Sequence, residues 1–289
     1  MALTADEILG NPAVDPCVRK LAQALLMIHD ASPRLASLFG TRQRWLMAHA
    51  ACALYFRDVI VNGPGGGLPM VRLLDIVEHY QVASRNTAAA FLKEMLKYDI
   101  VRHVAASEGK RNRTFEPAPT TLAALFQWHL LHLSALDGFD GGKRMATLGA
   151  QPEALQRLQP LIADGILGDN TVRKPEPTFA LFAWVDEGGM VMDRLIVGCE
   201  ETPSDVERVK TDATSVSGLA QRLKLSRTQL GRKLAVAEAM GSLGWVGARG
   251  KSRIWVSQGF RHEYHKAQAV KLAIIDAAYE SCFNVPSRS

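Results

Sequence analysis

The chain has few cysteines, no long apolar run and no strong overall excess of one charge. Its cysteines, Cys17, Cys52, Cys199 and Cys282, are far apart and form no CxxC pair, which argues against a disulfide framework and against a zinc site. No apolar run reaches the length of about 18 residues that a membrane-spanning helix needs. The first residues do not follow the pattern of a secretory signal. We therefore expect a cytoplasmic protein that does not contact a membrane.

Basic residues are unevenly distributed along this chain, whose formal net charge is +5. Residues 70–113 hold eight Lys or Arg and five Asp or Glu, a balance of +3. Residues 217–257 hold eight Lys or Arg and one acid, Glu238, a balance of +7. The rest of the chain is therefore net acidic. Two basic islands in an otherwise acidic chain indicate surfaces that bind a polyanion.

Glycine and proline divide the chain into segments, with connectors expected at 62–67, 137–142 and 173–177. The expected organisation is an N-terminal helical extension at 1–34, a first domain at 35–137, a linker with a short helix at 138–177 and a second domain at 178–289. Apolar residues at helical spacing predict helices at 41–60, 119–137, 152–168, 178–198 and 260–283. The glycine pair Gly188-Gly189 is a candidate break within 178–198. The fold is therefore expected to be mostly α.

The two halves share a pattern at an offset of 142 residues, which sets Ser84-Arg85 on Ser226-Arg227. In the second half, 216–223 predicts a short helix, and Ser226 suits the N-cap of the helix that follows. A strand-like run at 243–246, a basic turn and a second run at 254–256 then predict a β-hairpin with a basic tip. The first half has the same order, with one extra residue between its two helices and a hairpin over 100–115. Two short helices joined by a tight turn and followed by a basic hairpin are typical of a winged helix-turn-helix.

In this order of elements, residues 35–137 and 178–283 each resemble a winged helix-turn-helix domain of bacterial transcription regulators. The pattern is similar to that of the MarR (multiple-antibiotic-resistance-regulator) family, whose members pair through terminal helices. The resemblance implies two fused units, mostly α with small β-hairpin wings, in a pseudo-two-fold arrangement flanked by apolar helices. One chain would then be a monomeric pseudo-dimer.

Candidate DNA-contacting side chains lie on the second helix and the wing of each copy. In the first copy they are Ser84, Arg85, Asn86, Thr87 and Lys93 on the helix and Lys110, Arg111 and Arg113 on the wing. In the second copy they are Ser226, Arg227, Gln229, Arg232 and Lys233 on the helix and Arg249, Lys251 and Arg253 on the wing. Arginine can read guanine and Asn or Gln can read adenine in the major groove, whereas wing cations contact phosphates. We therefore expect a sequence-specific double-stranded DNA-binding transcriptional regulator; a small-molecule effector, if there is one, is not identified.

Other classes of function are a winged-helix scaffold that binds proteins, and a DNA-binding protein like a replication initiator. We expect no enzyme and no cofactor, because the glycine run 63–67 lacks the Lys-Ser/Thr of a P-loop and no GxSxG or HExxH motif is present. The pairs His129/His132 and His262/His265 are spaced i, i+3 but have no third or fourth ligand. We expect these histidines on polar faces or interfaces, and no metal site.

Overall fold

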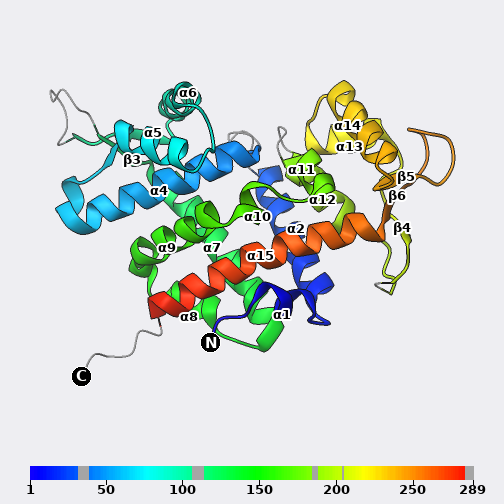
Figure 1. Ribbon diagram of the computed structural model, residues 1–289, viewed down its shortest axis with the longest axis horizontal. Helices are drawn as coiled ribbons and strands as arrows, with labels where there is room; N and C mark the ends of the chain where they lie inside the picture. Colours follow the sequence, from blue (N-terminus) through cyan, green and yellow to red (C-terminus); the bar gives the residue numbers. More distant parts are fainter. Residues whose placement is uncertain (32–38, 106–113, 184–187, 204, 284–289) are drawn as a thin grey trace. The chain divides into compact units, whose positions relative to one another are not determined.

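The computed structural model describes residues 1–31, 39–105, 114–183, 188–203 and 205–283 (Figure 1). Over these residues the chain is mostly helical and carries two small antiparallel sheets of three strands each. The prediction of a mostly α chain with small β-hairpins is confirmed at this level. None of the helices described there is both long and apolar enough to cross a membrane.

The chain forms two compact units, and neither is continuous in sequence. The first unit comprises Met1–Ile8, Gln43–Arg173 and Val270–Ser289, and the second comprises Leu9–Arg42 and Lys174–Ala269. The expected segments are thus divided differently: the N-terminal extension is shared between the units, and most of the expected linker 138–177 belongs to the first. Apolar periodicity identifies each helix but does not say which distant segment it packs against, so these divisions were not visible in the sequence.

The first unit contains a strand, two helices and a hairpin, surrounded by longer helices. In chain order its elements are α4 (Arg42–Asn62), η1 (Gly63–Gly65), β1 (Leu68–Pro69), α5 (Met70–His79), α6 (Arg85–Lys97), β2 (Val101–His103), β3 (Thr114–Pro117), α7 (Pro119–Asp140), α8 (Arg144–Ala150), η3 (Pro152–Ala154), α9 (Leu155–Gly168) and α10 (Asn170–Arg173). α7 ends three residues later than expected, before Gly141, which takes the left-handed conformation with φ 72°.

The second unit has the same central order. Its elements are α2 (Val14–Ala31), α11 (Pro177–Ala183), α12 (Gly188–Val197), β4 (Arg208–Lys210), α13 (Val216–Leu223), α14 (Arg227–Ala239), β5 (Leu243–Trp245) and β6 (Ile254–Ser257). α2 packs against α12, and α13 packs against α14. Three of the described helices are divided between the units: α1 (Ala5–Leu9), α4, whose first residue Arg42 belongs to the second unit, and α15 (Gln258–Phe283), whose residues from Val270 onward belong to the first unit.

The two units share a central arrangement that we name the first module (residues 68–117) and the second module (residues 208–257). In each, the last strand lies in the middle of the sheet, in the orders β1-β3-β2 and β4-β6-β5. The predicted helices and hairpin strands are present, whereas the first strands β1 and β4 were not expected. Five residues, 80–84, separate α5 from α6, and three, 224–226, separate α13 from α14. The first turn is therefore longer by two residues, where the sequence indicated one.

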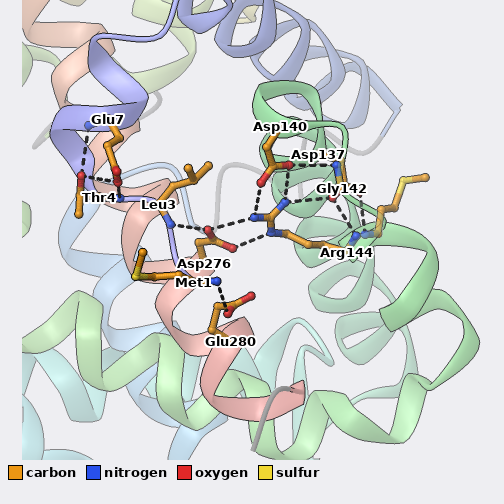
Figure 2. A network of polar contacts seen from close by, with 11 residues as sticks. Met1, Leu3, Thr4, Glu7, Asp137, Asp140, Gly142, Arg144, Asp276 and Glu280 are labelled. Atoms are coloured by element: carbon orange, nitrogen blue, oxygen red, sulfur yellow. Dashed lines mark hydrogen bonds and ion pairs between the residues drawn. The ribbon is translucent and has the colours of Figure 1, made fainter.

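A buried ion pair ties three distant segments of the first unit together (Figure 2). Arg144 donates from Nε to Asp276 Oδ1 at 2.6 Å and from Nη2 to Asp140 Oδ2 at 2.7 Å. The backbone N–H of Leu3 donates to Asp276 Oδ2 at 2.8 Å. Because Asp276 is fully buried, its charge is tolerated only with these partners. The ion pair therefore joins α15 to α7, α8 and the N-terminal segment of the first unit.

Candidate nucleic-acid interface

The helix α14 of the second module presents a polar, basic face to solvent. Leu230, Leu234 and Ala237 are buried on its other face. Arg227, Gln229 and Arg232 are exposed. The predicted N-cap is confirmed: the Ser226 hydroxyl accepts from the backbone N–H of Gln229, at 3.5 Å. The cap fixes where α14 begins and so places Arg227 and Gln229 in its first turn.

Lys233 does not share the exposed face of α14. It is half-buried, and its Nζ donates to the backbone carbonyl of Leu181 at 2.8 Å. Burial lowers the pKa of its ammonium group. Leu181 lies in the last turn of α11, where helical carbonyls have no partner within the helix. The long side chain reaches this carbonyl, so Lys233 turns toward α11 and away from the surface on which the sequence placed it.

The hairpin of the second module carries the three expected cations, Arg249, Lys251 and Arg253, all exposed. Arg249 Nε lies 2.7 Å from Glu238 Oε2, and Arg253 Nη1 lies 2.7 Å from Glu200 Oε1. Lys251 makes no ion pair with the residues that the structure describes. The expected turn glycine is Gly250, with φ 74°. Two of the three wing cations are thus already paired with acids.

A stack of Arg208, Trp255 and Gly244 within this sheet was not expected from the sequence. A Cβ on Gly244 would lie 2.3 Å from Trp255 Cζ2, so only glycine fits beneath the indole. On β4, the Arg208 guanidinium lies 4.4 Å from the centroid of a Trp255 ring. The strand β4 pairs with β6 in a register that places Val209 opposite Val256. The stack fixes the sheet from which the hairpin tip extends.

Two further cations of the second module were counted in the basic island but given no role. Arg222 is exposed near the end of α13, and Lys224 is exposed at its C-cap, in the left-handed conformation with φ 57°. The signal that identifies them is their position at the end of the first helix of the motif and in the turn that follows it. They lie on the same two-helix element as Arg227 and Arg232.

The first module has the same cap but a different charge arrangement. The Ser84 hydroxyl accepts from the backbone N–H of Thr87 at 3.2 Å, which confirms the predicted cap. Asn86, Thr87 and Lys93 are exposed. Arg85 Nη1 lies 2.7 Å from Asp75 Oδ1 and 3.0 Å from Glu78 Oε2.

The hydrogen bonds from Arg85 to Asp75 and then to Glu78 raise the pKa of its guanidinium. The remaining candidates on the first wing, Lys110, Arg111 and Arg113, lie outside the described residues.

A cavity of about 890 Å³ lies within the second unit, between the start of α2, the end of α12 and the start of α15. Asp15 in its wall lies 2.9 Å from Arg19 Nη2 and 3.3 Å from His265 Nε2. The hydrogen bond from His265, supported by Arg19, lowers the pKa of Asp15 to about 2. Glu200, which pairs with Arg253 on the hairpin, also lines this cavity. One residue of the cavity wall thus contacts the candidate interface.

His129 and His132 are buried, whereas the sequence placed them on a polar face or an interface. Each ring donates from Nδ1 to a carbonyl four residues earlier, Leu125 and Trp128, at 2.7 Å. With one polar atom satisfied in this way, the imidazoles occupy the apolar stripe of α7. Burial lowers the pKa of His129 to about 4.

The thiols show no sign of activation. Burial raises the pKa of Cys52 to about 12 and that of Cys199 to about 11, so both are protonated thiols near neutral pH. Among the residues that the structure describes, no group of three or more His, Cys, Asp or Glu is placed to hold a metal ion.

In comparisons with known proteins, the chain matches no family model, no curated protein and no solved structure. The resemblance to the MarR family therefore stays a prediction, based on the order of elements and on the basic residues of the second module.

Proposed function

We propose that the chain is a sequence-specific double-stranded DNA-binding transcriptional regulator, and that its two modules are winged helix-turn-helix domains similar to those of the MarR family. The observation that carries this proposal is the charge of the second module. Of the eight Lys and Arg in 217–257, all except Lys233 are exposed, and Glu238 is the only acid. A cationic surface of this kind gains free energy on DNA by releasing counterions.

The geometry of α14 supports insertion of its N-terminal half into the major groove. Arg227, Gln229 and Arg232 are exposed, and each is a residue type that reads base edges. The N-terminus of α14 carries the positive end of the helix dipole and free backbone N–H groups, which favour a nearby phosphate. Lys251 and its hairpin neighbours would contact phosphates beside the groove.

Apolar side chains on the same module favour a second candidate, a scaffold that binds proteins. Val236 on α14, Met240 at its C-cap and Val246 after β5 are 48%, 42% and 52% exposed. A scaffold has no need of cations at a wing tip, so the two functions differ in their response to salt. Retention on a DNA or heparin column that falls as salt rises favours DNA binding, and failure to bind at low salt favours the scaffold.

The decisive experiment measures affinity for a random duplex by fluorescence anisotropy at several salt concentrations. The variant R227A/R232A should lose more than about tenfold in affinity, and its salt slope should fall by about two. The matched control is K20A/K174A, which removes two exposed cations from the same unit but outside the module. Equal behaviour of the two double variants would exclude α14 from the DNA interface.

Sequence specificity and stoichiometry are tested separately. Selection from random duplexes should enrich a defined motif, and R227A or Gln229→Ala should relax one or two positions of it. Sedimentation of the complex should give one chain per selected site if a single chain is the binding unit. If no motif is enriched, the protein binds DNA without the proposed sequence specificity. It would then be closer to a replication initiator or an architectural protein.

A further inference from the structure

The two modules have the same order of elements but differ in charge where their helices would meet DNA. Residues 70–99 of the first module hold four basic residues and four acids. The matching residues 212–241 of the second module hold five basic residues and two acids. Both of those acids, Asp212 and Glu238, are paired with arginines, Arg194 and Arg249. The helix pair of the second module thus has surplus positive charge, and that of the first has none.

The position of the acids matters as much as their number. Asp75 and Glu78 lie on α5, with side chains 60% and 63% exposed, and both contact Arg85 in the first turn of α6. Val82 and Leu225 make equivalent turn bonds to the carbonyls of Val77 and Ala220, which sets the offset before the turn at 143 residues. The two acids then correspond to Gly218 and Gln221 on α13, which carry no charge. Arg227, the counterpart of Arg85, is exposed and makes no ion pair with a described residue.

These contacts leave Arg85 poorly suited to DNA. To reach a base or a phosphate it would have to leave two carboxylates, and exposed ion pairs of this kind are weak enough to break. After they break, however, Asp75 and Glu78 remain exposed beside the helix N-terminus and would face the phosphates. Like charges brought together at an interface oppose binding, and a neutral surface releases no counterions.

We propose that the α5–α6 surface of the first module does not read DNA, and that Asp75 and Glu78 are the residues that exclude it. This inference rests on the proposed function. Among the residues that the structure describes, it leaves the helix pair of the second module as the only one that reads DNA. The two modules then differ in function. The second contacts the duplex, whereas the first has the same order of elements but carries the exposed acids Asp75 and Glu78 beside the N-terminus of α6.

The test is a gain of function. The variant D75N/E78Q frees Arg85 and should bind a random duplex roughly three- to tenfold more tightly at low salt, with a salt slope steeper by about one. Adding Arg85→Ala to that variant should abolish the gain. The matched control E153Q/D164N makes the same change of net charge in the same unit and frees Arg57 from Asp164, outside the module. It should bind like the unmodified chain.

Two results would overturn the inference: D75N/E78Q indistinguishable from the control, or Arg85→Ala in the unmodified chain costing as much affinity as Arg227→Ala. Under the proposal, Arg85→Ala alone changes affinity by less than about twofold. Failure of the proposed function gives a different result, because R227A/R232A and K20A/K174A would then bind DNA with equal affinity. The two failures are therefore distinguishable in one set of measurements.

Discussion

At the scale of single residues, the cations of the second hairpin are not equivalent. Arg249 and Arg253 are paired with Glu238 and Glu200, whereas Lys251 has no acidic partner among the described residues. A paired arginine must exchange a carboxylate for a phosphate, so its net gain on DNA is smaller. The unpaired ammonium group exchanges only water and counterions.

Lys251→Ala should therefore weaken binding to every duplex sequence by about the same factor and reduce the salt slope by about one. Arg253→Ala should cost less, because Arg253 must give up its ion pair with Glu200 before it can contact a phosphate. The measurement is affinity as a function of salt on two unrelated duplexes. If Lys251→Ala changed affinity on only one of them, Lys251 would contact bases and not the backbone.

Local residue patterns predicted some side-chain roles and missed others for a physical reason. The caps Ser84 and Ser226 were predictable, because a cap bonds to an N–H three residues away. The inward turn of Lys233 depends on the end of α11, about fifty residues earlier, and no local pattern encodes it. His129 and His132 follow the apolar spacing of Leu125 and Leu136, so the spacing of α7 indicates their burial, whereas their residue type indicates a polar face.

At the scale of elements, the N-terminus of α14 is the feature on which recognition depends. Ser226 can be replaced in two ways that separate stability from binding. Ser226→Ala removes the cap and should lower the free energy of unfolding by about 1 kcal/mol. Ser226→Asp keeps a capping oxygen and complements the helix dipole, so stability should hold.

Ser226→Asp should nevertheless weaken DNA binding more than Ser226→Ala, because its carboxylate would lie where a phosphate approaches. Urea denaturation and anisotropy on the same samples check both parts. Ser215→Asp is the control, since Ser215 caps α13 by accepting from Gly218. If Ser226→Asp bound DNA like the unmodified chain, the N-terminus of α14 would not face the duplex.

The elements themselves were predicted unevenly. Long helices such as α7 and α15 were found to within a few residues, because their apolar spacing extends over many turns. The strands β1 and β4 have two and three residues, too few for an alternating pattern. They are strands because distant partners complete the ladder, with Leu68 opposite Phe115 and Val209 opposite Val256. Short strands of this kind are set by tertiary pairing.

At the scale of the whole molecule, buried histidines make the first unit sensitive to acid. Burial lowers the pKa of His49 to about 3 and that of His129 to about 4, and it places the pKa of His132 well below 6.5. An unfolded histidine takes a proton near pH 6.5, whereas these folded ones do not. Stability is therefore fully present above about pH 6.5 and is lost as the pH falls toward 4.

The free energy of unfolding, measured in urea between about pH 7.5 and pH 5, should fall by roughly 1 to 1.5 kcal/mol per histidine for each pH unit below 6.5. His132→Gln should flatten this dependence, because glutamine does not titrate. His79→Gln is the control at an exposed position and should leave the dependence unchanged. An equally steep dependence in His132→Gln would assign the acid sensitivity to other groups.

The contact of Arg144 and Leu3 with Asp276 determines the order in which the two units can finish folding during synthesis. Asp276 is made about a hundred residues after Arg173, and ribosomes add roughly 5 to 20 residues per second. For some 5 to 20 s the first two segments of the first unit exist without α15, so the Arg144 guanidinium has no Asp276 to bury. The second unit is completed in that interval, when its segment Lys174–Ala269 is made. The half of the protein that begins first is therefore completed last, and a chain that stops before Asp276 carries a finished second unit beside an unfinished first one.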